Sequence, residues 1–236
     1  MVTSDTGKGV LSPEDSARVS NAILVAEHAT SGEIFCVLAR EVSSYRDVSL
    51  GWAAAAALLA PMLLIPLGFE PSWLPGVGDS WEAAQLAARD SLLARTLTAY
   101  AVLQAFVFVI VFLIACWPPL RRLLTPPALL RARVRKAALR QFMAHGLHMT
   151  QDRTGVMIFA ALSERRVEVI ADAGIHARVD SAIWAEAVNT LTTAMRRGVP
   201  AEGFEAAVAL VGAVLAEHFP PRPANPDELP NRLVEM

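Results

Sequence analysis

The sequence predicts an α/β fold: a small central sheet flanked by helices and interrupted by a two-helix transmembrane hairpin. Two runs without Asp, Glu, Lys or Arg, residues 49–69 and 97–117, are each long enough to cross a bilayer as a helix. Three strand-like runs and four helix-like stretches outside them predict the α/β part. The mean hydropathy of +0.39 agrees with a membrane segment in the chain.

The first α/β segment contains one helix and one strand. The helix is predicted to begin at Ser12, which can cap it ahead of Pro13, and to end at Gly32. Residues 34–39 are apolar without alternation, as in a strand buried on both faces. One helix and one strand are too little to form a core alone, so this segment needs the later half of the chain.

The later half supplies the remaining elements. Residues 127–145 place an apolar residue at every fourth position and predict a helix, and residues 156–162 predict a second doubly buried strand. Residues 167–171 alternate, as in the returning arm of a hairpin. Amphipathic helices follow around residues 183–195 and 204–215. Because both continuous strands need partners, the two halves are expected to share one sheet.

Three parts follow from this pattern. A split α/β domain is predicted over residues 12–48 plus 128–220. The transmembrane hairpin takes residues 49–118, with an external loop over residues 70–95. Residues 221–236 are rich in proline without an apolar core and are predicted to be disordered.

The charges predict orientation and exclude one class of partner. A basic cluster follows the second apolar run, whereas only two arginines lie between the runs. The cluster comprises Arg121, Arg122, Arg131, Arg133, Arg135, Lys136 and Arg140. Because positive residues stay on the cytoplasmic side, both termini are predicted to be cytoplasmic. The net charge of −2 gives no signal for nucleic-acid binding, and two cysteines without metal-ligand spacing favour a reducing compartment.

Two consecutive stretches carry a family resemblance. Residues 154–159, with the sequence TGVMIF, and residues 164–175, with the sequence ERRVEVIADAGI, resemble the TPM domain family. Residues 30–34 are similar to the entry to the first strand of that family. The family includes thylakoid-lumen proteins linked to photosystem II repair and bacterial membrane-anchored proteins. The resemblance implies a small α/β sandwich and a two-span protein of the bacterial inner membrane.

The same resemblance bears on activity. Acid-phosphatase activity and calcium binding are attributed to some members, which follow the second strand with a glycine-tyrosine-glycine type of turn. Here that turn reads Asp172-Ala173-Gly174-Ile175, which departs from the pattern. The sequence therefore leaves open whether the protein is an enzyme.

Carboxylates near the predicted hairpin are candidate metal ligands. Asp172, Glu164 and Asp180 could hold calcium or magnesium, because hard cations prefer oxygen ligands. Alternatively, Asp172 and Asp180 cap the starts of helices. Arg165 or Arg178 is predicted to hold phosphate as a bidentate donor.

Arg131 and Arg135 belong to the basic helix after the membrane segment. They are predicted to contact anionic lipid headgroups, and the alternative is a topology signal on a solvated helix face. No nucleophile, base and acid occur in a recognisable catalytic spacing, so no catalytic residue is assigned.

The first functional hypothesis is a membrane-anchored module for interaction or membrane-protein quality control. Its expected partners are the lipid bilayer and a membrane or membrane-associated protein. The alternative is a divalent-metal-dependent, acid-phosphatase-like hydrolase that uses Asp172.

Overall fold

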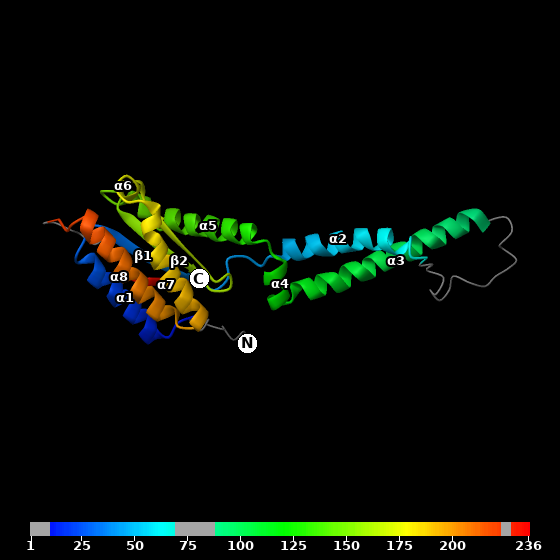
Figure 1. Cartoon of the computed structure of the whole chain (residues 1–236), viewed down its shortest axis with the longest axis horizontal. Coiled ribbons are helices and arrows are strands. Elements are labelled where there is room, and N and C mark those ends of the chain that lie inside the picture. The colour runs from blue at the N-terminus through cyan, green and yellow to red at the C-terminus, as the bar shows by residue number, and fades with distance from the viewer. Residues whose placement is uncertain (1–9, 69–87, 223–227) are drawn as a thin grey trace, which may run out of the picture. The chain divides into compact units, whose positions relative to one another are not determined.

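The computed structural model describes residues 10–68, 88–222 and 228–236. The chain divides into two compact units. One is an α/β unit formed by Met1–Ser43 and Pro127–Met236, and the other is a helical unit formed by Ser44–Pro126 (Figure 1). The predicted fold class is confirmed.

A four-stranded mixed sheet forms the centre of the α/β unit, with the strand order β3-β2-β1-β4. The strands are β1 (Glu33–Ala39), β2 (Gly155–Ala161), β3 (Arg166–Ala171) and β4 (Leu233–Glu235). Strand β1 runs parallel to β2 and β4, whereas β2 and β3 are antiparallel. The pairing of β1 with β2 confirms that the two halves of the chain share one sheet.

Strand β4 corrects the prediction of a disordered tail. Residues 221–236 were expected to lack structure, but Leu233–Glu235 pairs with β1, and the Met236 N–H donates to the Leu38 carbonyl at 3.0 Å. The proline-rich composition predicts the absence of a helix and of a separate core. That composition still allows a strand of three residues to pair with the open edge of β1. In this strand, Leu233 contacts one core and Val234 contacts the other.

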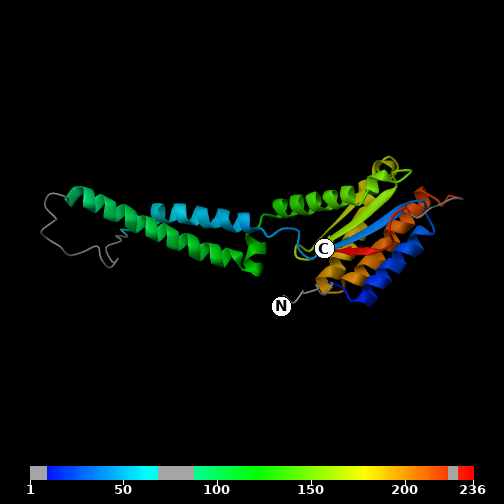
Figure 2. The ribbon, with the colours of Figure 1, turned by 180° about the vertical axis from the view of Figure 1, so that it is seen from behind.

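Helices cover both faces of the sheet (Figures 1 and 2). One face packs against α1 (Pro13–Glu27), α7 (Ala185–Arg197) and α8 (Pro200–His218), and the other packs against α5 (Pro127–Ala144). This burial on both faces explains why β1 and β2 are continuously apolar.

Alternate residues of the strands face the two cores. Cys36 and Ile158 belong to the core with α1, α7 and α8, while Phe35 and Met157 belong to the core with α5. Burial, helped by the nearby Glu27 carboxylate, raises the pKa of the Cys36 thiol far above its usual range. The thiol therefore stays protonated and unreactive in the folded domain.

Helix α1 begins as predicted and ends earlier. The Ser12 hydroxyl accepts from the Asp15 N–H at 3.0 Å. The helix stops at Glu27 rather than at Gly32. Two bonds hold the intervening chain in another conformation: the Glu27 carboxylate accepts from the Ile34 N–H at 2.7 Å, and the Thr30 hydroxyl donates to the Phe219 carbonyl at 2.6 Å.

The helical unit contains α2 (Arg46–Leu64), α3 (Ala88–Cys116) and α4 (Pro118–Leu124). By length and composition, Arg46–Leu64 and Leu97–Cys116 are suited to cross a membrane. The first of these helices begins three residues before the predicted span, because Arg46 and Asp47 form its first turn. Residues 70–87 of the predicted external loop lie outside the described residues.

Side chains at the base of the hairpin link its helices. The Ser49 hydroxyl donates to the Ala115 carbonyl at 3.0 Å, which joins α2 to α3. The Trp52 indole N–H donates to the Leu124 carbonyl at 3.0 Å, which joins α2 to the end of α4. These bonds hold the two apolar helices in an antiparallel hairpin.

Candidate functional site

Strand β3 lies at an edge of the sheet and pairs with β2. The Asp172 N–H donates to the Gly155 carbonyl at 2.9 Å, so the alternation of an antiparallel ladder points the backbone groups of Val167, Val169 and Ala171 away from β2. Across the described part of the chain, no hydrogen bond reaches these outward groups. Three N–H groups and three carbonyl groups therefore point away from β2; Val169 is half-buried, whereas Val167 and Ala171 are buried.

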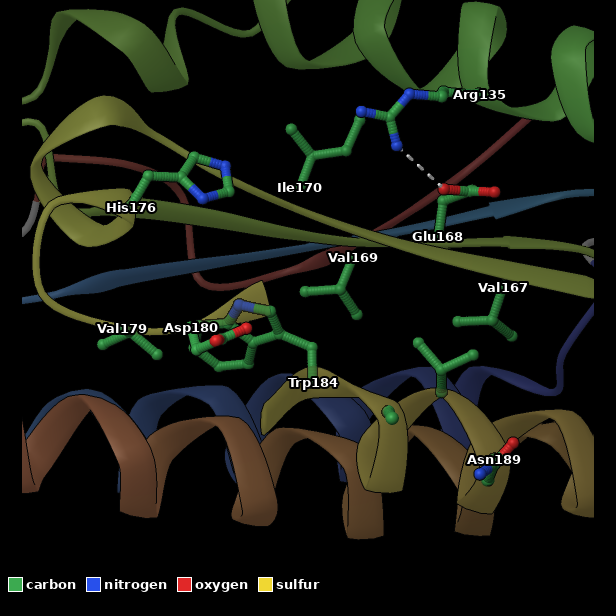
Figure 3. Close-up of a pocket in the computed structure, with 12 residues that line it drawn as sticks. Arg135, Val167, Glu168, Val169, Ile170, His176, Val179, Asp180, Trp184 and Asn189 are labelled. Carbon is green, nitrogen blue, oxygen red and sulfur yellow. Dashed lines mark ion pairs between the residues drawn. The ribbon is translucent and has the colours of Figure 1, made fainter. Parts of the chain in front are cut away.

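A cleft of about 840 Å³ follows this edge between α5 and α7 (Figure 3). The Glu168 and Ile170 side chains face α5, on the same side of β3 as Arg135. The Val169 side chain faces the opposite side, where Trp184 lies directly before α7. The wall on the α5 side therefore carries the charged groups of Arg135 and Glu168 beside Ile170, and the other wall is mainly apolar.

Trp184 lines this cleft and carries a buried, unsatisfied donor. Its side chain is 5% exposed, and within the described residues the indole Nε1–H has no hydrogen-bond acceptor. A buried donor without an acceptor costs about 1–3 kcal/mol.

A second cleft of about 520 Å³ lies at the start of β3 and shares Val167 and Val188 with the first. Arg165, Arg166 and Arg196 line it. Neither the Arg165 nor the Arg196 guanidinium group forms a hydrogen bond or ion pair with the residues that the structure describes. The start of the edge is therefore the more basic end.

Glu168 is the acidic group at the middle of the edge. Burial raises the pKa of its carboxyl group, and the positive charges of Arg135 and Arg166 offset part of this shift. The Arg135 Nη1 lies 3.7 Å from the Glu168 Oε2, but the arginine side chain is largely exposed, so the pair adds little stability.

Replacing Glu168 with glutamine is expected to stabilise the domain at neutral pH and to lose that advantage in acid. A raised pKa in the folded state means that the folded protein binds the proton more tightly than the unfolded chain. Wild-type stability therefore falls as the pH rises from the ordinary carboxyl pKa of 4.5 through the raised value. Urea denaturation of both proteins at pH 4 and pH 7 measures this, and an equal difference at the two pH values would contradict it.

The two predicted aspartate ligands both cap short helices. The Asp172 Oδ1 accepts from the Ala173 N–H at 2.7 Å at the start of α6 (Ala173–His176). The Asp180 Oδ1 accepts from the Ala182 N–H at 2.9 Å. These bonds favour the capping interpretation for both residues. The Asp172 Oδ2 is buried and has no partner among the described residues.

The three predicted metal ligands do not converge. Glu164 precedes β3 and Asp172 follows it, so a six-residue strand of about 20 Å separates them. Over the described residues, no three His, Cys, Asp or Glu side chains are grouped to hold a metal ion. The Asp172 Oδ2 supplies one of the six to eight oxygens that calcium prefers, and binding of calcium or magnesium stays a prediction.

The predicted anion-binding arginines lie in three places. Arg165 and Arg135 line the two clefts along β3. The Arg178 guanidinium lies 5.1 Å from the centre of the Phe219 ring and donates to the His218 carbonyl at 3.4 Å, beside the end of α8. Arg131 is exposed on α5. Phosphate binding by Arg165 or Arg178 stays a prediction.

Sequence reasoning missed the cleft residues Trp184, Val188 and Arg196. The available signal was the alternation of residues 167–171, which is typical of a strand with one partner at the end of a sheet. An edge strand flanked by an amphipathic helix predicts a groove, but not which side chains line it.

The comparisons with known proteins agree with this fold. The sequence model of the TPM domain family matches residues 123–214. Among solved structures, the chain is similar to the NMR structure of the BA42 protein from the psychrophilic bacterium Bizionia argentinensis, with a TM-score of 0.54, 16% identity and 100% of each chain covered. At that identity the likeness shows the fold alone. No curated protein matches the sequence.

Proposed function

We propose that this chain, which carries a TPM domain, is a membrane-anchored interaction module that binds an extended segment of another protein along β3. The partner would be a membrane or membrane-associated protein, and membrane-protein quality control is the process that we propose. The outward backbone groups of Val167, Val169 and Ala171 are the observation that carries the proposal.

Strand addition explains several features of this edge together. An extended segment can pair with the outward N–H and carbonyl groups, and its alternate side chains then face the two walls of the cleft. An exposed edge without such a partner is an aggregation hazard, which proteins usually suppress with charge, proline or a covering element.

The apolar helices supply the proposed anchor. Large apolar side chains on α2 and α3, including Met62 and Phe106, are exposed in the helical unit, as lipid-facing residues are. Two spans return the chain to the side from which it left, and the basic residues after the hairpin favour the cytoplasmic side of a bacterial inner membrane. Exposed arginines on α5, including Arg131, would then contact anionic headgroups. Protease protection of tags at both ends checks this orientation.

Val169→Pro tests strand addition. Proline removes the outward N–H that an added strand needs, while the bonds between β2 and β3 are kept because the residue 169 N–H does not point toward β2. Peptides selected by display against the full chain in nanodiscs are expected to bind the variant at least about tenfold more weakly. Fluorescence anisotropy of the selected peptides measures the change.

Val169→Thr is the matched control, because it keeps the N–H and the β-branched shape. We expect it to bind the selected peptides within about twofold of the wild type. Circular dichroism verifies that both variants fold. Equal binding by a folded Val169→Pro variant, or selection of no peptide by the wild type, would refute strand addition at β3.

The hydrolase alternative has no comparable support. The carboxylates that it needs, Asp172 and Glu164, lie at opposite ends of β3. We therefore do not advance it beyond a prediction.

A further inference from the structure

The two ends of the β3 edge differ in charge. At the start of the strand, Arg165, Arg166 and Arg196 line one cleft. The Glu164 carboxylate in the same cleft accepts from the Val42 N–H at 3.1 Å. The three guanidinium groups outnumber this carboxylate, so the start of the edge attracts negative charge.

The far end of the edge has a different character. His176, Asp180 and Trp184 lie around the end of β3, and Asp180 brings a negative charge. An acidic group would therefore be repelled at this end and attracted at the other. The charge difference fixes which way a charged segment can lie.

From this asymmetry we infer that the partner segment is an extended peptide with alternating apolar residues and acidic side chains at its carboxyl end, bound antiparallel to β3. This inference rests on the proposed function. In an antiparallel arrangement the carboxyl end of the added strand lies beside the start of β3, where Arg165 and Arg196 are unpaired within the described residues. Charge complementarity then sets the direction of binding.

The apolar part of the segment follows from the wall on the side of α7. Val167, Val169 and Val188 line this wall together with Trp184. Because side chains of a strand alternate between faces, every second residue of the bound segment meets this wall. The intervening residues meet the polar wall, where Arg135 and Glu168 lie.

A second copy of this chain fits the edge less well than a single strand. In each copy α5 and α7 flank β3, so pairing of two edges would also have to pack these helices of the two copies against each other. A single extended segment has no such flanking helices. The occupant is therefore a peptide segment of a partner protein.

Capped, fluorescein-labelled peptides of seven residues test the inference with the full chain in zwitterionic nanodiscs. The first peptide has valine at alternate positions and two glutamates at the carboxyl end. The second has the reverse order, and the third replaces the glutamates with glutamine. We expect the first to bind about fivefold more tightly than either of the others, and this preference to shrink at high salt.

The double variant Arg165→Gln and Arg196→Gln is expected to bind the first peptide no more tightly than the wild type binds the glutamine peptide. If the wild type binds all three equally and Val169→Pro loses them all, the inference about charge and direction fails while strand addition stands. If no peptide binds to the folded wild type, both fail. A dimer in light scattering that Val169→Pro dissociates would show a second copy at the edge and would also overturn the inference.

Discussion

Phe204→Ala is expected to remove about 3–5 kcal/mol of folding free energy, because truncating a buried phenylalanine loses its apolar contacts and leaves a cavity. Phe204 lies on α8 and is 0% exposed, in the core between the sheet and the helices α1, α7 and α8. Leu191 of α7 and Ile23 of α1 belong to the same fully buried set. Domains of this size are stable by about 5–15 kcal/mol, so the loss would unfold much of the α/β unit.

Urea denaturation of the full chain, followed by circular dichroism, measures this loss. Leu24→Ala is the matched control, because Leu24 on α1 is 43% exposed and its truncation leaves no enclosed cavity. We expect the control to cost less than about 1 kcal/mol. A Phe204→Ala variant as stable as the control would show that α8 does not hold the core as described.

Deletion of residues 233–236 is expected to cost about 2–4 kcal/mol and to promote aggregation, through the loss of several backbone hydrogen bonds and of apolar contacts. The deletion removes β4 and the bonds between Met236 and β1. It also removes the Glu235 carboxylate, which accepts from the Leu11 N–H at 3.2 Å just before α1. Strand β1 would become an unprotected sheet edge.

Thermal denaturation and light scattering of the truncated protein test this expectation. Val234→Thr keeps the backbone of β4 and serves as the control, with a small expected effect because Val234 is partly exposed. Glu235→Gln separates the contribution of the contact with residues 10 and 11 from that of the strand. A truncated chain with wild-type stability would show that β4 contributes nothing to the sheet.

Much of the fold could be predicted because the local patterns agree with the tertiary environment. Strands β1 and β2 are continuously apolar because helices cover both faces of the sheet. Ser12 caps α1 through a bond within one turn, which sequence spacing alone can indicate. Strand β4 was missed because three residues carry too little periodicity, and its partner β1 is distant in the sequence.

The candidate site was harder to predict because its residues come from separate elements. Which of them meet depends on the order of the strands and on how the helices are placed along β3. Asp172 appeared suited to ligate a metal, but one of its oxygens caps α6, a bond that depends on where β3 ends. Trp184 and Arg196 lie on or beside a helix whose position along β3 no local pattern reveals. A groove at a strand edge depends on strand order, and strand order is a property of the whole fold.

The parallel pairing of β1 with β2 has a consequence for synthesis on the ribosome. Strand β1 is translated before the hairpin, whereas β2 emerges only after α2, α3, α4 and α5. With the membrane anchoring proposed above, the nascent chain would have to keep an apolar strand unpaired while the hairpin entered the lipid. Closure of the sheet would then require that both ends of the hairpin reach the same compartment. A chain inserted with the wrong number of spans would leave β1 and β2 unpaired and open to proteases.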